Sequence, residues 1–135
     1  MSRGLNNRNP GNIRHSSSLF KGEKESSSDP EFKQFKGMAW GYRAMFVILN
    51  TYHKRYSLNT LREMITRWAP PSENHTNIYV EYVSRRAMLD ADTPIDTMQR
   101  ETMIAMVAAM SQMENGQKAD WGAVERGWDL FIASM

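Results

Sequence analysis

The segment from residue 96 to residue 114 constrains the fold most, because its second half carries apolar side chains on almost every side of a helix. A helix that is apolar all round has to be buried in a protein core. Its apolar side chains are Met98, Met103, Ile104, Met106, Val107, Ala108, Ala109, Met110 and Met113. The next two residues, Asn115-Gly116, are typical of a left-handed helix cap. We therefore predict a central helix that starts at about Asp96 and ends at Glu114.

Other helices are predicted from apolar residues that recur at helical spacing in four further segments: 40–56, 61–68, 78–83 and 120–131. The pattern Thr60-x-x-Glu63 is a capping box at the start of the second segment, and Asp120 can cap the last one. Ile78 and Trp121 belong to the apolar faces of their segments, so we expect both side chains to point inward.

The first forty residues differ from the rest, because they are rich in Asn, Gly, Ser, Lys and Pro and show no helical period. Ser-Ser-Ser occurs twice, at 16–18 and 26–28, as is typical of loops. Leu19-Phe20 and residues 32–35 are predicted to form a short, irregular β-hairpin. No repeat or linker divides the chain. We therefore predict a mainly α fold, with residues 1–135 as a single domain that carries a short irregular or β-hairpin N-terminal segment.

Composition excludes several classes of function. The chain has 135 residues and no cysteine, which suits one domain without disulfides or thiolate chemistry. Its three histidines are scattered without ligand spacing, so no metal and no other cofactor is expected. No apolar run is long enough to span a membrane, and the N-terminus lacks the apolar stretch of a signal peptide. The lack of cysteine fits the cytoplasm, a virion or a lysate equally, so we expect that something else delivers the protein to its target.

Glu114 is the residue that most directly indicates chemistry, because it lies in the last turn of the most buried predicted helix. Apolar neighbours and the negative end of the helix dipole both favour the neutral carboxylic acid over the ionised form. A neutral acid is what glycosidic cleavage needs, because the leaving oxygen must receive a proton. The alternative interpretation is a solvated glutamate at a frayed helix end.

A second candidate region is the block that runs from Arg67 through Trp68, two prolines and Glu73 to Asn74 and Thr76. The rigid double proline presents Glu73, Asn74 and Thr76 at the start of a helix, where they can cap the helix or face a groove. Trp68 can serve as a platform for a sugar ring, although at helical spacing a tryptophan is more often part of the core. We predict Glu73 as a second catalytic acid and the others as substrate-binding.

Asparagines near the N-terminus form the third candidate region. Asn7, Asn9 and Asn12 offer several amide donors and acceptors of the kind that bind carbohydrate, and the alternative is a surface turn. Glu23 is a further candidate for a second carboxylate. Its lysine neighbours, Lys21 and Lys24, favour its ionised form, which makes it a poorer general acid than Glu114.

Several of these motifs resemble a known family. The string Arg8-Asn9-Pro10-Gly11-Asn12-Ile13-Arg14, together with Gly41-Tyr42-Arg43-Ala44 and the Trp-Ala-Pro-Pro block at 68–71, resembles phage and prophage proteins described as virion structural proteins. The resemblance covers nearly the whole chain. It implies a location in a phage particle and contact with other virion proteins, and it leaves the activity open.

A more distant resemblance concerns enzymes that cleave the cell-wall glycan. Residues 9–14 are similar to the Asn-Leu-Phe-Gly-Ile-Lys block of flagellar-type glucosaminidases. Residues 73–83 are similar to the Glu-Thr-x-x-Tyr-Val-x-x-Val ending of soluble lytic transglycosylases, and both groups of enzymes are expected to have lysozyme-like folds. In both groups the catalytic glutamate precedes these blocks, whereas here no acidic residue precedes Asn9. If the chain is circularly permuted, the resemblance implies Glu114 as the general acid, Glu73 and Tyr79 as groove residues, and Asn9 and Asn12 as part of the sugar-binding wall.

Three hypotheses on function follow from these observations. The first is a lysozyme-like enzyme that cleaves bacterial peptidoglycan, as a lytic transglycosylase or as a muramidase or glucosaminidase. The second is a virion structural or wall-binding protein on the same scaffold without turnover. The third is a small nucleic-acid-binding helical domain. A net charge of +2 is compatible with any anionic polymer. The basic residues are dispersed and no recognition helix stands out, so nucleic acid is the least favoured partner.

Overall fold

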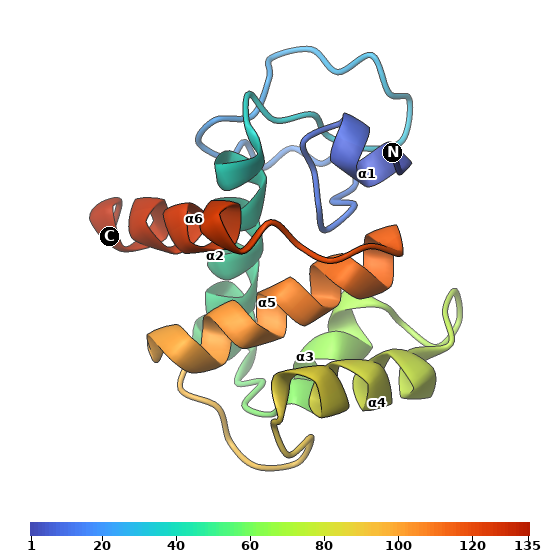
Figure 1. Ribbon diagram of the computed structural model, residues 1–135, viewed down its shortest axis with the longest axis vertical. Coiled ribbons are helices and arrows are strands. Elements are labelled where there is room, and N and C mark those ends of the chain that lie inside the picture. The colour runs from blue at the N-terminus through green and yellow to red at the C-terminus, as the bar shows by residue number, and fades with distance from the viewer.

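Helix α5 (Arg100–Asn115) runs through the middle of the computed structural model, which describes residues 1–135 (Figure 1). Half of its residues are buried, as its apolar sequence predicts. Gly116 adopts a φ of 71° and ends the helix in the predicted left-handed cap. The predicted start was wrong by one turn. The Asp96 carboxylate accepts the backbone N–H of Met98 in a separate turn, and Gln99 caps the helix instead.

The other helices surround α5 on two sides. The elements in chain order are α1 (Arg3–Asn6), α2 (Met38–Tyr56), α3 (Leu61–Trp68), α4 (Thr76–Ala87), α5 and α6 (Trp121–Ala133). Helix α6 packs across α2, and α4 packs along α5 (Figure 1). The contact between α2 and α6 is centred on Phe46, whose ring lies 5.1 Å from the Trp128 ring and 6.0 Å from the Phe131 ring. The mainly helical fold class is thus confirmed, and none of these helices is both long and apolar enough to cross a lipid bilayer.

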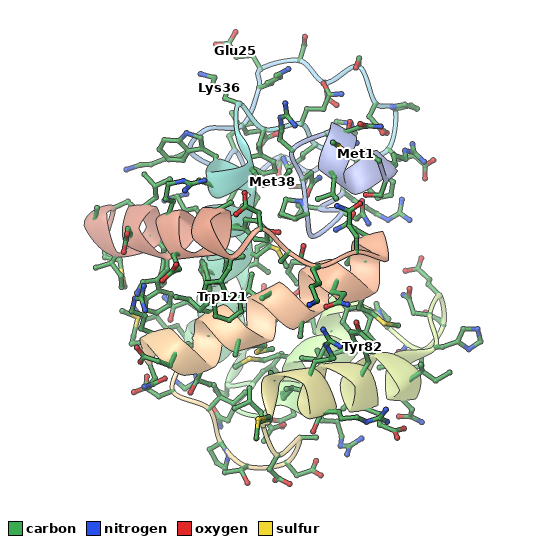
Figure 2. All side chains as sticks on the ribbon, in the orientation of Figure 1. Met1, Glu25, Lys36, Met38, Tyr82 and Trp121 are labelled. Carbon is green, nitrogen blue, oxygen red and sulfur yellow. The ribbon has the colours of Figure 1, made fainter.

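The observed helix ends and buried faces can be compared with the caps and apolar faces predicted from the sequence. Both predicted caps are present, because Thr60 and Glu63 form the capping box and Asp120 accepts the backbone N–H of Ala123. The inward orientation predicted for Ile78 and Trp121 was wrong, since these side chains are 59% and 52% exposed. Each belongs to the first turn of its helix, where other residues take the buried positions, namely Thr76 in α4 and Ala123 in α6. Trp121 lies at the start of α6, beside α5 (Figure 2).

The first 37 residues form an irregular cap over one end of α2, as Figures 1 and 2 show. The predicted pairing of Leu19-Phe20 with residues 32–35 is absent. Two isolated bridges, between Arg14 and Phe32 and between Glu23 and Phe35, are present instead, so the segment is irregular and not a hairpin. Buried polar groups, and not paired strands, stabilise this segment. The ammonium of Lys33, whose side chain is 1% exposed, lies 2.9 Å from the Glu23 carboxylate.

Asp29 is the second polar anchor of this cap. Its carboxylate accepts two hydrogen bonds from the Arg3 guanidinium, both 2.7 Å long, and one of 2.9 Å from the Asn7 side-chain amide. The backbone N–H groups of Glu31 and Phe32 also donate to it. These donors, Arg3 above all, hold the pKa of Asp29 well below its usual value near 3.8. The ionised carboxylate therefore stabilises the folded cap.

We expect Asp29→Asn to lower the free energy of unfolding at neutral pH and to have less effect in acid. A carboxylate with a lowered folded pKa contributes stability above its unfolded pKa, near 3.8, and loses it as the pH falls toward the folded value. The difference between wild type and variant should therefore be constant above about pH 5 and shrink below pH 4. Thermal melts from pH 2 to pH 8 measure it, and a difference that grows in acid would contradict this role of Asp29.

Candidate functional site

A groove of about 460 Å³ lies where the N-terminal cap meets the C-terminal end of α5. One wall is residues 11–14 of the cap, and the other is residues 67–70 with the loop that leads to α4. Figure 1 shows the end of α5 next to the cap, with the α3–α4 loop on the same side of the molecule. Glu114 lies in this groove, as do Glu73 and Asn74. The structure thus brings together five predicted site residues from three distant parts of the chain, namely Asn12, Trp68, Glu73, Asn74 and Glu114.

Three side chains donate hydrogen bonds to the Glu114 carboxyl group. Asn12 Nδ2 lies 3.0 Å from Oε1, while Trp68 Nε1 and Tyr79 Oη lie 3.3 and 3.0 Å from Oε2. The donors come from the cap, from α3 and from α4. Glu114 is therefore a fixed and partly solvated acid and not a frayed helix end.

Asn115 ties the cap to the end of α5 and so brings Asn12 to Glu114. Its side-chain amide donates to the Pro10 carbonyl over 2.8 Å, and its side-chain oxygen accepts the Ser2 hydroxyl over 2.7 Å. Gly4 allows this approach, because a Cβ there would lie 2.6 Å from the side-chain oxygens of both Asn115 and Asn12. Residues more than a hundred positions apart in the chain are thereby in direct contact.

Trp68 is half-buried and lies between Gly11 and Glu114. A Cβ on Gly11 would lie 2.8 Å from the Trp68 ring, so the absence of a side chain at residue 11 lets the indole approach the cap. One edge of the ring thus packs on the cap backbone, while its N–H points to the Glu114 carboxylate. The indole both closes the end of the groove and orients the acid.

Tyr79 lies behind Glu114 and does not line the open groove, because it is only 5% exposed. Burial is the main reason that the pKa of its phenol is raised well above the usual value, and the negative charge of Glu114 adds to this effect. The phenol therefore keeps its proton at all physiological pH values. It acts as a permanent hydrogen-bonding partner of Glu114.

Four of the predicted residues have structural positions outside the groove. Asn9 is fully buried, and its amide bonds the backbone of Ile13 and the Lys33 carbonyl. Asn7 bonds Asp29 and Gln34 within the cap. The buried Thr76 hydroxyl donates to the Ala69 carbonyl and joins α3 to α4. The Glu23 carboxylate forms an ion pair with the Lys33 ammonium. These four side chains therefore hold the fold together and do not line the groove.

The groove also contains side chains that were not selected from the sequence, namely Arg14, Phe32, Ile48, Tyr52 and Arg67. Arg67 directly precedes Trp68 in the sequence block that was singled out, so its proximity to the site could have been expected. Tyr52 lines the groove from α2. No group of three or more His, Cys, Asp or Glu side chains is arranged to hold a metal ion.

Fold and site together define a small helical domain with a carboxyl-bearing polar groove at the C-terminal end of its central helix. No model of a known protein family matches the chain. The chain is 35% identical over 131 residues to Protein P5 of Pseudoalteromonas phage PM2, a match that covers 94% of this chain and 80% of that protein. The chain therefore belongs to the family of this phage protein, as the first resemblance predicted at the level of phage origin. The more distant resemblance to lysozyme-like enzymes stays a prediction.

Proposed function

We propose that this phage protein cleaves the glycan strand of bacterial peptidoglycan, with Glu114 as the general acid. The observation that carries the proposal is the carboxyl group of Glu114, held by donors from three segments inside a groove of about 460 Å³. A groove with a few convergent polar groups is the usual form of a ligand site. A glutamic acid fixed within such a groove is what protonation of a glycosidic oxygen requires.

The donor set indicates which oxygen of Glu114 would carry the transferable proton. An indole N–H can only donate, so Oε2, which accepts from Trp68, has to keep its lone pair free. Oε1 has Asn12 as its partner, and the Asn12 amide can present either its oxygen or its nitrogen to that position. We infer that Oε1 carries the proton in the acid form. After the transfer, Trp68 and Tyr79 still donate to the carboxylate, and Asn12 donates to it with its amide nitrogen turned toward Oε1.

The reaction then needs a nucleophile at the anomeric carbon. Oε1 gives its proton to the glycosidic oxygen as the C–O bond breaks, and the carboxylate takes a proton back from the attacking hydroxyl. Attack by the sugar's own 6-hydroxyl gives an anhydro end, as in a lytic transglycosylase, whereas attack by water gives a reducing end. Glu73 is exposed at the rim of the groove, where it is available as a second carboxylate for the water route. We favour the transglycosylase route, because Glu23 does not reach the groove and Glu73 is exposed at its rim.

Incubation of purified sacculi with the protein, followed by mass spectrometry of the soluble fraction, tests this proposal. Fragments with anhydro ends are expected, and fragments with reducing ends would assign the water route instead. The identity of the terminal sugar gives the bond that is cut. If the protein pellets with sacculi but releases nothing, the enzyme proposal fails and a non-catalytic wall-binding or virion structural role takes its place.

Tyr79→Phe is expected to slow fragment release about tenfold and to lower the free energy of unfolding by about 1 kcal/mol. The change removes one of the two hydrogen bonds to Oε2 and leaves a buried ring of the same shape. Tyr82→Phe is the matched control, since Tyr82 belongs to the same helix and makes no hydrogen bond to Glu114 (Figure 2). Equal rates for the two variants would contradict a role of the Tyr79 hydroxyl in the reaction.

A further inference from the structure

We propose that Arg67 forms a carboxylate-binding subsite of the groove, which recognises the peptide side chains of peptidoglycan in preference to a neutral glycan. This inference rests on the proposed function, because it assigns a substrate class to the same groove. Nothing in the family match addresses it. It is carried by the position of the arginine, by its lack of an acidic partner and by the charge of its neighbours.

Two tyrosines hold the guanidinium of Arg67 at the groove. Its Cζ atom lies 3.7 Å from the centre of the Tyr56 ring and 5.4 Å from the centre of the Tyr52 ring. Both tyrosines lie in the second half of α2, while Arg67 lies in the last turn of α3. Stacking uses the flat face of a guanidinium and leaves its N–H edge available for hydrogen bonds. The cation is therefore oriented before any ligand arrives, which reduces the entropy that binding would cost.

Arg67 has no acidic partner in the protein. Arg14, which also lines the groove, is paired with Glu31, and Arg62 on the same helix as Arg67 is paired with Asp92. No ion pair of the structure includes Arg67. An oriented guanidinium without a carboxylate is suited to take one from a ligand, through two parallel hydrogen bonds.

The charges in the groove indicate which ligand fits. Glu73 and Glu114 are the acidic side chains that line it, and the exposed Glu73 carboxylate repels an anionic substrate. A neutral glycan would not need a cation to offset this repulsion. Peptidoglycan differs from neutral glycans of the same sugars in its peptide side chains, which carry free carboxylates. Arg67 lies on the same wall as Trp68, so it can meet a peptide carboxylate while the sugar lies against the indole.

Calorimetric titration with a soluble GlcNAc-MurNAc-tetrapeptide tests binding at the subsite, because this compound lacks the MurNAc–GlcNAc bond that a lytic transglycosylase cuts. The titration compares the native peptide with the same compound whose carboxyl groups are converted to primary amides. We expect wild type to bind the native compound about tenfold more tightly than the amide. Arg67→Met should bind both compounds equally, at the level that wild type shows for the amide. The preference of Arg67→Lys for the native compound should lie between those of wild type and Arg67→Met, because an ammonium cannot form the two parallel hydrogen bonds.

Arg55→Met is the matched control, because Arg55 carries the same charge at the end of α2, lies outside the groove and takes part in no ion pair. It should bind like wild type, and circular dichroism should show all variants folded. The inference is overturned if wild type does not distinguish the two compounds, or if Arg67→Met weakens both by the same factor. The outcome for the proposed function is separate. Sacculi from which wild type releases nothing would refute the cleavage activity, even where the Arg67-dependent preference in binding is found.

Discussion

Glu114→Gln is expected to slow the release of glycan fragments by about a thousandfold while the protein stays folded. Glutamine has the shape of glutamic acid, and its amide oxygen can still accept hydrogen bonds from Trp68 and Tyr79 at the position of Oε2. Its amide nitrogen at the position of Oε1 can face the Asn12 amide oxygen after that side chain flips. The amide has no acidic proton to give to the leaving oxygen, so only the chemical step is lost. Initial rates of fragment release, followed by chromatography with mass detection, measure the effect.

The control for this variant is Glu81→Gln, which removes the same charge from an exposed ion pair on α4. Exposed pairs of this kind contribute little, so its rate and stability should equal those of wild type. Binding of Glu114→Gln to sacculi should also be retained, since the groove keeps its shape. If Glu114→Gln keeps more than about a tenth of the wild-type rate, Glu114 is not the general acid.

Glu73→Gln in the same assay addresses the route of the reaction. An anhydro product formed at an unchanged rate would leave Glu73 as a binding residue at the rim. A large loss of reducing-end product would make it the second carboxylate. The two glutamates therefore have distinguishable roles, although both line the groove.

The fold was predictable where local pattern and burial agree. The apolar second half of α5 can only be buried, and Gly116 can only end the helix, so both features were predicted from the sequence and are present. The capping box at Thr60 is equally local, because donor and acceptor are three residues apart. The cap was not predictable in detail. Its structure depends on buried polar pairs such as Lys33 with Glu23, and no periodicity indicates which lysine is buried.

The site was predictable only in part, for a related reason. An asparagine side chain has the same donors and acceptors whether it binds a ligand or holds a loop, so the sequence could not separate Asn12 in the groove from the buried Asn9. Glu114 was identifiable because the sequence itself places it in the last turn of a buried helix. Its partner Asn12 is 102 positions away in the chain, a contact that only the folded structure provides. The role of Arg67 could not be predicted from the sequence, because only the folded structure shows that no acidic side chain pairs with it.

The pair of Lys33 and Glu23 links the stability of the cap to the site. The Lys33 ammonium donates to both oxygens of Glu23 and to the Ser18 carbonyl, in a position where 1% of its side chain and 8% of that of Glu23 are exposed. The carbonyl of Lys33 in turn accepts from Asn9, whose amide also bonds the backbone of Ile13, next to Asn12. Loss of the pair should therefore loosen the segment that carries Asn12 to Glu114.

Lys33→Met is accordingly expected to destabilise the protein by about 3–5 kcal/mol, because it leaves the buried Glu23 carboxylate without its counter-charge. That is a large part of the roughly 5–15 kcal/mol that stabilises a domain. Lys24→Met, at an exposed neighbouring lysine, is the control and should change little. Adding Glu23→Gln to Lys33→Met should restore part of the loss, since no charge then remains buried. Urea unfolding measures the stabilities. Hydrogen exchange of the cap amides shows whether the loosening begins there, and a Lys33→Met variant as stable as Lys24→Met would mean that the cap does not depend on this pair.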